Sequence, residues 1–107
     1  VAKAKVVVVL GHTGCGAIKG SIADVDLGHL HFITRKVQRC FSEIKKEHPN
    51  ILAQDFEDKV THKNVTQGIE DLKNNSTILA DLLYKKEIAI IGGVYNLSTG
   101  VVEFFEA

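Results

Sequence analysis

The fold is decided by KVVVVLGHTGCG, the stretch that runs from Lys5 to Gly16. Its first half is a continuous run of β-branched residues without polar alternation, which is typical of a strand covered on both faces in a parallel sheet. Three glycines fall within the six residues from Gly11 to Gly16, and they indicate a sharp backbone turn that another group approaches closely. The stretch therefore predicts a buried strand that ends in a tight turn.

The middle of the chain is predicted to be helical. A short helix is expected to start near Ala17, and apolar residues spaced by three and four predict longer amphipathic helices over residues 30–47 and 53–73. Pro49 is expected to end the first of these, and Gly68 weakens the second by about 1 kcal/mol relative to alanine. Ser76 is typical of the N-cap of one more helix. The inner face of that helix would consist of Ile78, Leu79, Leu82 and Leu83.

The C-terminal part predicts a strand over residues 87–95, turn residues over 96–100 and a last strand over 101–105. The expected fold class is α/β, with a mostly parallel sheet, helical crossovers and a C-terminal antiparallel hairpin. Such a sheet leaves one edge of the first strand unpaired, which soluble proteins avoid. The chain also lacks methionine and begins at Val1. Residues 1–107 are therefore expected to form a single partial domain whose remaining strands lie upstream.

The overall charge excludes several classes of partner. Thirteen basic residues balance thirteen acidic ones, so no long-range field favours nucleic acid or an anionic membrane. No apolar run approaches the roughly 18 residues of a membrane span. The two cysteines are too few for a disulfide framework and fit a reducing compartment, so a cytoplasmic location is expected. A small molecule or another protein is the expected partner.

His12 and Cys15 are the candidate metal ligands. They lie three residues apart on the turn after the first strand, at the edge where open α/β sheets bind ligands. Imidazole and thiolate are both good zinc ligands. The spacing alone is a weak signal, and the alternative is a satisfied core histidine beside an inert thiol. The spacing of Gly11 and Gly16 also fits a phosphate-binding loop, but Ala17 and Ile18 stand where lysine and a hydroxyl residue are required.

Several segments resemble the β-class carbonic anhydrases. GHTGCGAIKGSI, which follows VVVVL, resembles the zinc motif of that family, and Asp26-Leu27-Gly28 resembles a loop of it. The helical segment that starts at Asn64 and the sequence EIAIIGGVYNLSTGVVEFF are similar to its later helices and final hairpin. The hairpin contains a Gly-x-x-Tyr-x-x-x-Thr-Gly pattern from Gly92 to Gly100.

The resemblance implies a Zn2+ ion held by two cysteines and one histidine, with His12 and Cys15 as two of these ligands. In the family the other cysteine belongs to a Cys-x-Asp-x-Arg motif on an earlier strand, which is absent here, and its Asp/Arg dyad lies beside the metal. Zinc-bound water is then the nucleophile that converts carbon dioxide to bicarbonate. The backbone amide of Gly16 is a candidate substrate contact. The resemblance also implies a homodimer or higher oligomer, with the missing segment supplying the third protein ligand.

Two other functions stay open at the level of sequence. A catalytically inactive relative would keep the fold as a scaffold or regulatory module, and a nucleotide-binding α/β module would use the glycine turn without a metal. Cys40 lies on an apolar helix stripe and is interpreted as a packing residue. His29 and His31 could bind metal if they were exposed, but a polar start to a helix is the simpler interpretation.

Overall fold

The computed structural model describes residues 4–22 and 31–106. Its sheet has the strand order β1-β2-β3, formed by β1 (Val6–His12), β2 (Ala89–Tyr95) and β3 (Val102–Glu106). β1 and β2 are parallel, with Val6 opposite Ala89 and His12 opposite Tyr95, whereas β2 and β3 form an antiparallel hairpin. The predicted α/β sheet with a C-terminal hairpin is confirmed, and β1 is an edge strand in the described part of the chain.

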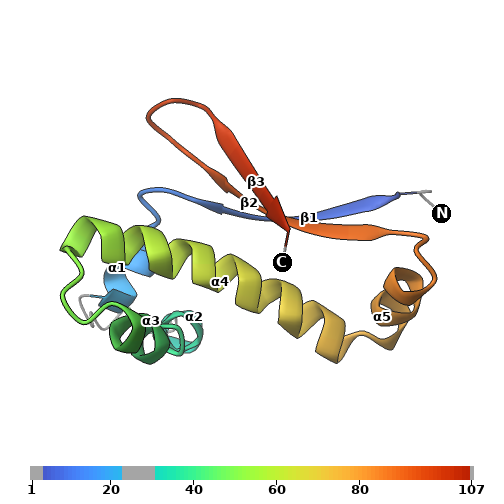
Figure 1. Cartoon of the computed structure of the whole chain (residues 1–107), viewed down its shortest axis with the longest axis horizontal. Coiled ribbons are helices and arrows are strands. Elements are labelled where there is room, and N and C mark those ends of the chain that lie inside the picture. Colours follow the sequence, from blue (N-terminus) through green and yellow to red (C-terminus); the bar gives the residue numbers. More distant parts are fainter. Residues whose placement is uncertain (1–3, 23–30, 107) are drawn as a thin grey trace.

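Helices connect the two parallel strands. They are α1 (Gly16–Ile22), α2 (His31–Gln38), α3 (Phe41–Glu47), α4 (Ala53–Asn75) and α5 (Thr77–Tyr84). Figure 1 shows the long helix α4 running beneath the strands, with the other described helices on the same side of the sheet. The segment Asp26-Leu27-Gly28, which resembles a loop of the family, and His29 lie outside the described residues. None of the helices in residues 4–22 and 31–106 combines the length and apolar character that crossing a bilayer requires.

The predicted single helix over residues 30–47 is wrong in one respect, because it is broken between α2 and α3. The backbone N–H of Cys40 donates to the carbonyl of Val37 at 2.9 Å, so the chain closes a tighter turn there. The break directs Cys40, which is 2% exposed, into the same apolar cluster as Val37 and Ile44. Burial of the apolar stripe therefore outweighs helix continuity.

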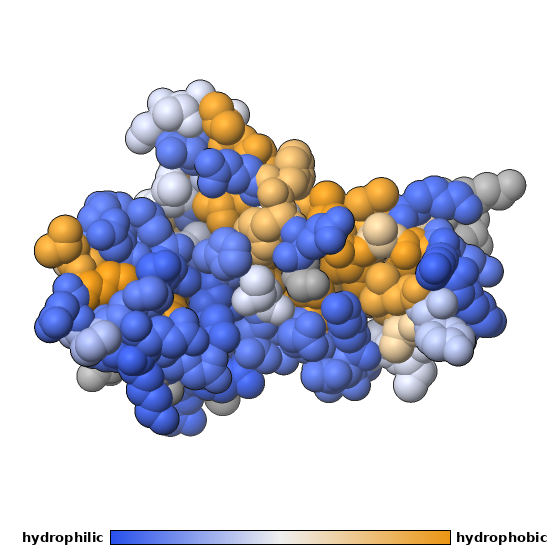
Figure 2. All heavy atoms as spheres, viewed as in Figure 1, coloured by the Kyte–Doolittle hydropathy of each residue, from blue (hydrophilic) through white to orange (hydrophobic). Residues whose placement is uncertain are grey.

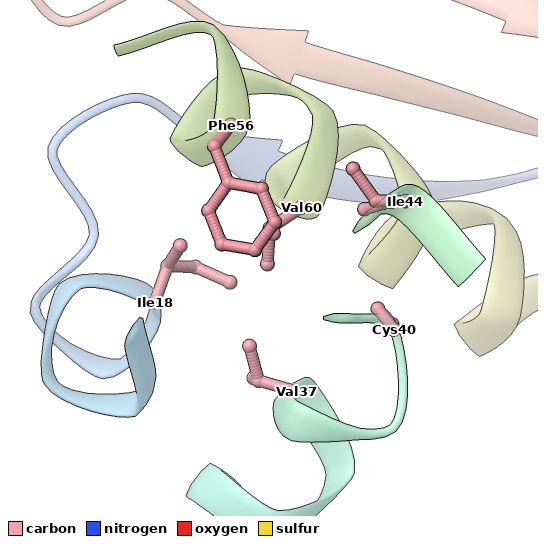
Figure 3. Close-up of a cluster of buried hydrophobic side chains, with 6 residues drawn as sticks. All are labelled: Ile18, Val37, Cys40, Ile44, Phe56 and Val60. Atoms are coloured by element: carbon pink, nitrogen blue, oxygen red, sulfur yellow. The ribbon is translucent and has the colours of Figure 1, made fainter. Parts of the chain in front are cut away.

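The main core lies among the helices rather than on the sheet. Figure 3 shows its six side chains pointing toward one another from α1, the α2–α3 region and α4. They are Ile18, Val37, Cys40, Ile44, Phe56 and Val60. α4 belongs to this cluster through its N-terminal half, and its buried Val65 and Ile69 continue the apolar face along the helix. Because α4 contacts both the helical core and β1 and β2, it fixes the helices relative to the strands.

The prediction that the first strand is covered on both faces is wrong for the described part of the chain. Side chains alternate along β1, and the face that carries Val7, Val9 and Gly11 is turned toward α4, since a Cβ on Gly11 would lie 2.9 Å from Val65 Cγ2. The opposite face exposes Val6 (51%) and Leu10 (55%). The helices of the described residues form one layer, which covers only one face of the strand.

Helix α5 forms where it was predicted, but its inner face is not buried. Oγ of Ser76 accepts the backbone N–H of Leu79 at 3.2 Å, which confirms the N-cap. However, α5 has no buried residue, and Ile78 is 73% exposed. The physical reason is that α5 packs mainly against α4, and no other described element forms a second layer over it. Figure 2 shows apolar side chains between the hairpin and the α5 end of the molecule, whereas mostly hydrophilic side chains cover α3 and neighbouring α4.

Candidate functional site

His12 is the last residue of β1 and lies on the open face of the sheet. The burial pattern along the strand alternates, with Val6, Val8, Leu10 and His12 exposed and the residues between them partly covered. Since successive side chains of a strand point to opposite faces, the imidazole belongs to the face that α4 does not cover. Any metal held by His12 is therefore bound on the open side, at the carboxyl end of a parallel strand.

The hydrogen bond of His12 determines which ring nitrogen is free. Nδ1 lies 2.8 Å from the backbone carbonyl oxygen of Thr13. A carbonyl can only accept, so Nδ1 must carry the proton, and in the neutral ring Nε2 then keeps an unprotonated lone pair. Metal-ligating histidines commonly donate their second nitrogen to a carbonyl in this way. In its neutral form, a ring held in this way presents Nε2 to a metal.

Cys15 lies in the turn between β1 and α1, immediately before the helix. Its thiol is free, and the half-buried residue packs against the helical core cluster. Its carbonyl accepts the backbone N–H of Lys19 at 3.0 Å, which anchors the residue to the first turn of α1. Gly14 has φ +67°, a left-handed conformation that glycine adopts without strain. The sharp turn predicted from the glycines is thus present, and it brings both candidate ligands to the same end of β1.

Gly16 is the first residue of α1 and is exposed. Among the described residues, a Cβ placed on it would meet nothing within 4 Å. Packing against those residues therefore gives no reason for glycine at this position, and its suggested contact with substrate stays a prediction.

Thr13 connects this turn to the hairpin, a role that sequence reasoning missed. Its backbone N–H donates to the carbonyl of Tyr95 at 2.9 Å, and its Oγ1 accepts the backbone N–H of Leu97 at 3.0 Å. Leu97 also lies beside Gly14, since a Cβ there would be 3.6 Å from Leu97 Cδ1. Tyr95 and Leu97 are more than 80 positions away from Thr13 in sequence, so no local sequence pattern predicts these hydrogen bonds.

The chemistry of the donors fits half of a zinc site. A lone pair on imidazole nitrogen and a free thiol match the nitrogen and sulfur ligands of zinc, but structural and catalytic sites use three or four protein ligands. Within residues 4–22 and 31–106, no group of three or more His, Cys, Asp or Glu residues is placed to hold a metal. A zinc site at His12 and Cys15 would therefore need at least one further ligand from outside the described residues.

Cys40 is a packing residue, as the sequence suggested. It is 2% exposed within the core cluster, and desolvation by burial raises the pKa of its thiol, against a smaller opposing effect of the nearby Lys63 ammonium. A buried thiol that is harder to deprotonate is a poor metal ligand. His31 is the first residue of α2.

The open face beside His12 is apolar. Leu10 and Phe104 lie on either side of Gly93, whose added Cβ would lie 3.2 Å from a carbon atom of each side chain. Phe104 is 61% exposed, whereas the neighbouring Phe105 points to the other face and stacks on the ring of His62 with the ring centroids 3.9 Å apart. The two phenylalanines thus serve different surfaces, and His62 is exposed although its ring carries this stacking contact.

The other face of the hairpin offers a cleft of about 640 Å3, which Thr13 borders together with residues of α4 and the hairpin. Its lining carries the carboxylates of Asp58 and Glu103 and, among the described residues, neither lysine nor arginine. Two carboxylates disfavour the binding of an anion in this cleft.

Comparison with known proteins identifies the family. The family model described as carbonic anhydrase matches residues 1–102. A carbonic anhydrase of Mycolicibacterium smegmatis is 33% identical over 105 residues, covering 96% of this chain and 50% of that protein.

The solved structures with a similar fold include β-carbonic anhydrases. CafA of Aspergillus fumigatus superposes with a TM-score of 0.85 at 19% identity, over 94% of this chain and 48% of that one. A structure from Sordaria macrospora, in a study of two tetrameric β-carbonic anhydrases, gives 0.83 at 18% identity, over 96% and 53%. The chain thus spans about half the length of the relatives it matches. From its sequence motif, its fold and these matches, the chain belongs to the β-carbonic anhydrase family.

Proposed function

We propose that the complete protein to which this chain belongs catalyses the zinc-dependent, reversible hydration of carbon dioxide, with His12 and Cys15 as two of the protein ligands. The observation that carries the proposal is the pairing of a free thiol with an imidazole whose Nδ1 is engaged at 2.8 Å by the Thr13 carbonyl, on a turn at the carboxyl end of a parallel strand. Family membership supports the same reaction at a coarser level.

Zinc would supply the essential chemistry, because it lowers the pKa of water to about 7 and so provides a nucleophile at neutral pH. The residues of this chain would hold and orient the ion. Nε2 of His12 offers a neutral donor, and the thiolate of Cys15 offers negative charge that partly balances the ion. The amide of Gly16, next to Cys15, would contact bound substrate or product. The apolar face beyond Leu10 would exclude water from one side of the site.

The third protein ligand would come from a segment that pairs with the free edge of β1. Two features support this placement: β1 has a partner on one side only among the described strands, and its outer face is exposed. A strand added to that edge would end beside His12, because the carboxyl ends of neighbouring parallel strands meet at one edge of a sheet. Residues 1–107 would then be the C-terminal part of one domain. Association into a homodimer or larger oligomer is part of the same proposal.

The experiment is a measurement of zinc content and carbon dioxide hydration in the complete gene product. Wild type is expected to hold about one zinc ion per chain and to accelerate hydration. Cys15→Ser should lose both, because a neutral hydroxyl replaces a thiolate ligand. Cys40→Ser serves as the matched control, since it makes the same atomic change inside the helical core, and it should keep its zinc. Full zinc content and activity in Cys15→Ser would reject the assignment of Cys15.

An inactive scaffold is the second candidate, and it is favoured by the absence of a third ligand among the described residues. Zinc content separates the two functions. A complete gene product that folds without zinc, and gains no hydration activity when zinc is added, would be such a scaffold.

A further inference from the structure

Thr13 makes three hydrogen bonds in three directions. Its carbonyl accepts Nδ1 of His12 at 2.8 Å, its N–H donates to the carbonyl of Tyr95 at 2.9 Å, and its Oγ1 accepts the N–H of Leu97 at 3.0 Å. The first bond sets the proton position on the imidazole. The other two fasten the residue to the end of β2 and to the turn that follows it.

The β2–β3 turn, to which Thr13 is bonded, is held together by its own hydrogen bonds. Oδ1 of Asn96 accepts the N–H groups of Ser98 at 2.9 Å and of Thr99 at 3.2 Å. The N–H of Asn96 donates to the carbonyl of Val101, and the N–H of Gly100 donates to the carbonyl of Asn96, both at 2.8 Å. The amide of Leu97 is therefore presented from a fixed backbone, and it can serve as an anchor for a neighbouring loop.

We propose that Thr13 is a positioning residue for the metal ligands, an inference that rests on the proposed function. Its side chain fastens the turn from His12 to Cys15, the ligand turn, to the β2–β3 turn. It thereby holds the Thr13 carbonyl against His12. The hydroxyl is not proposed as a metal ligand, since its Oγ1 accepts the N–H of Leu97. It acts through the backbone of the same residue, which orients the imidazole, and through Gly14, which packs beside Leu97. Outer contacts that orient a ligand typically contribute a factor of about 10 to 100 in metal affinity.

The test uses Thr13→Val in the complete gene product, because valine keeps the shape and removes the acceptor. Zinc affinity is measured by competition with a chromogenic chelator, and Thr13→Val is expected to bind about tenfold more weakly than wild type. Thr13→Ser keeps the hydroxyl and should restore the affinity. The matched control is Thr99→Val, which removes an equivalent bond to the N–H of Val101 within the same turn. It does not reach the ligand turn and should leave zinc affinity unchanged.

A second readout is independent of the metal. In the zinc-free protein, 15N NMR of the His12 ring should show the proton on Nδ1 in wild type and a larger share on Nε2 in Thr13→Val. Hydrogen exchange of the Leu97 amide should be faster in Thr13→Val than in Thr13→Ser. A wild-type ring protonated on Nε2 would overturn the inference even if no variant folds.

The outcomes separate this inference from the proposed function. If wild type binds zinc and Thr13→Val binds it equally well, the positioning role is wrong and the function stands. If Thr13→Val and Thr99→Val weaken binding equally, the effect is general to the turn and the role is again wrong. If wild type binds no zinc, the proposed function fails, and the positioning role fails with it.

Discussion

The side chains of Leu10 and Phe104 flank Gly93 on the open face of the sheet, each with a carbon atom 3.2 Å from the place a Cβ on that glycine would take. They come from β1 and β3, which are not neighbours in the sheet, so the glycine of β2 lets two exposed side chains form one apolar surface. Leucine and phenylalanine at 55% and 61% exposure beside a candidate ligand mark a surface that is expected to be covered in the complete protein.

Replacing both Leu10 and Phe104 with serine tests whether this face is covered. If a second layer packs on it, the double variant loses apolar burial worth about 1.5–3 kcal/mol for each side chain. Leu52→Ser is the control, since Leu52 is 72% exposed in the connection before α4 and should change little. The free energy of unfolding in urea would be measured for the complete gene product. Equal, small effects for both variants would show that the face stays open to solvent.

Gly92 and Gly68 should respond to alanine in opposite directions. A Cβ on Gly92 would lie 2.5 and 2.8 Å from ring carbons of Phe105, so Gly92→Ala is expected to destabilise the fold by about 1–3 kcal/mol through overpacking. A Cβ on Gly68, inside α4, would make only an ordinary 3.5 Å contact with Val9. Gly68→Ala should therefore stabilise by about 0.5–1 kcal/mol, the helix propensity difference. Thermal unfolding of the two variants would measure this, and a loss of stability in both would contradict the packing at Gly68.

Local sequence patterns predicted most of the helices and strands. The β-branched run before His12, the three-and-four spacing from Phe56 to Ile69 and the turn residues from Asn96 to Gly100 each reflect interactions between near neighbours, and each element formed where the pattern predicted it. The break at Cys40 could not be predicted this way, because it depends on a cluster assembled from α1 and α4. The open faces of β1 and α5 could not be predicted from local patterns either. Such a pattern indicates that a surface is apolar but not whether another element covers it.

The sequence predicts only those parts of the candidate site that lie close together along the chain. His12 and Cys15 lie on one turn, so their proximity followed from the motif. The hydrogen bond that leaves Nε2 of His12 available depends on backbone geometry at Thr13, and the link from Thr13 to Leu97 joins opposite ends of the chain. A third ligand requires residues outside the described part of the chain.

The two cysteines should differ in their reactivity toward an alkylating reagent. Cys15 is half-buried on a turn, whereas Cys40 is 2% exposed and burial raises its pKa, so less of it is present as thiolate. In the zinc-free gene product, iodoacetamide followed by peptide mass spectrometry should therefore label Cys15 first. Added zinc should slow labelling of Cys15 and leave Cys40 unchanged. Protection of neither residue by zinc would argue against Cys15 as a ligand.

The ion pair between Glu43 and Lys63 predicts how stability depends on pH. Nζ of Lys63 lies 2.6 Å from Oε2 of Glu43 and joins α4 to α3. The hydrogen bond from Lys63 lowers the pKa of Glu43, and the same bond raises the pKa of Lys63. A carboxyl group with a lowered pKa stabilises the fold above its ordinary pKa and loses this contribution as pH falls through the folded value. An amine with a raised pKa stabilises below its ordinary pKa and loses the contribution as pH rises through the folded value.

Glu43→Gln should therefore be slightly less stable than wild type between these limits, which include neutral pH. The difference should vanish in acid, well below the ordinary glutamate pKa of about 4.3, because wild type is then protonated as well. The side chains of Glu43 and Lys63 are 61% and 36% exposed. Because salt screens exposed charges, 1 M salt should also reduce the stability difference between Glu43→Gln and wild type at neutral pH. Urea midpoints of the two proteins across a pH series, at low and high salt, measure both effects. A difference that persists unchanged in acid would show that Glu43 acts through packing of its side chain, because only a charged carboxylate can lose its contribution on protonation.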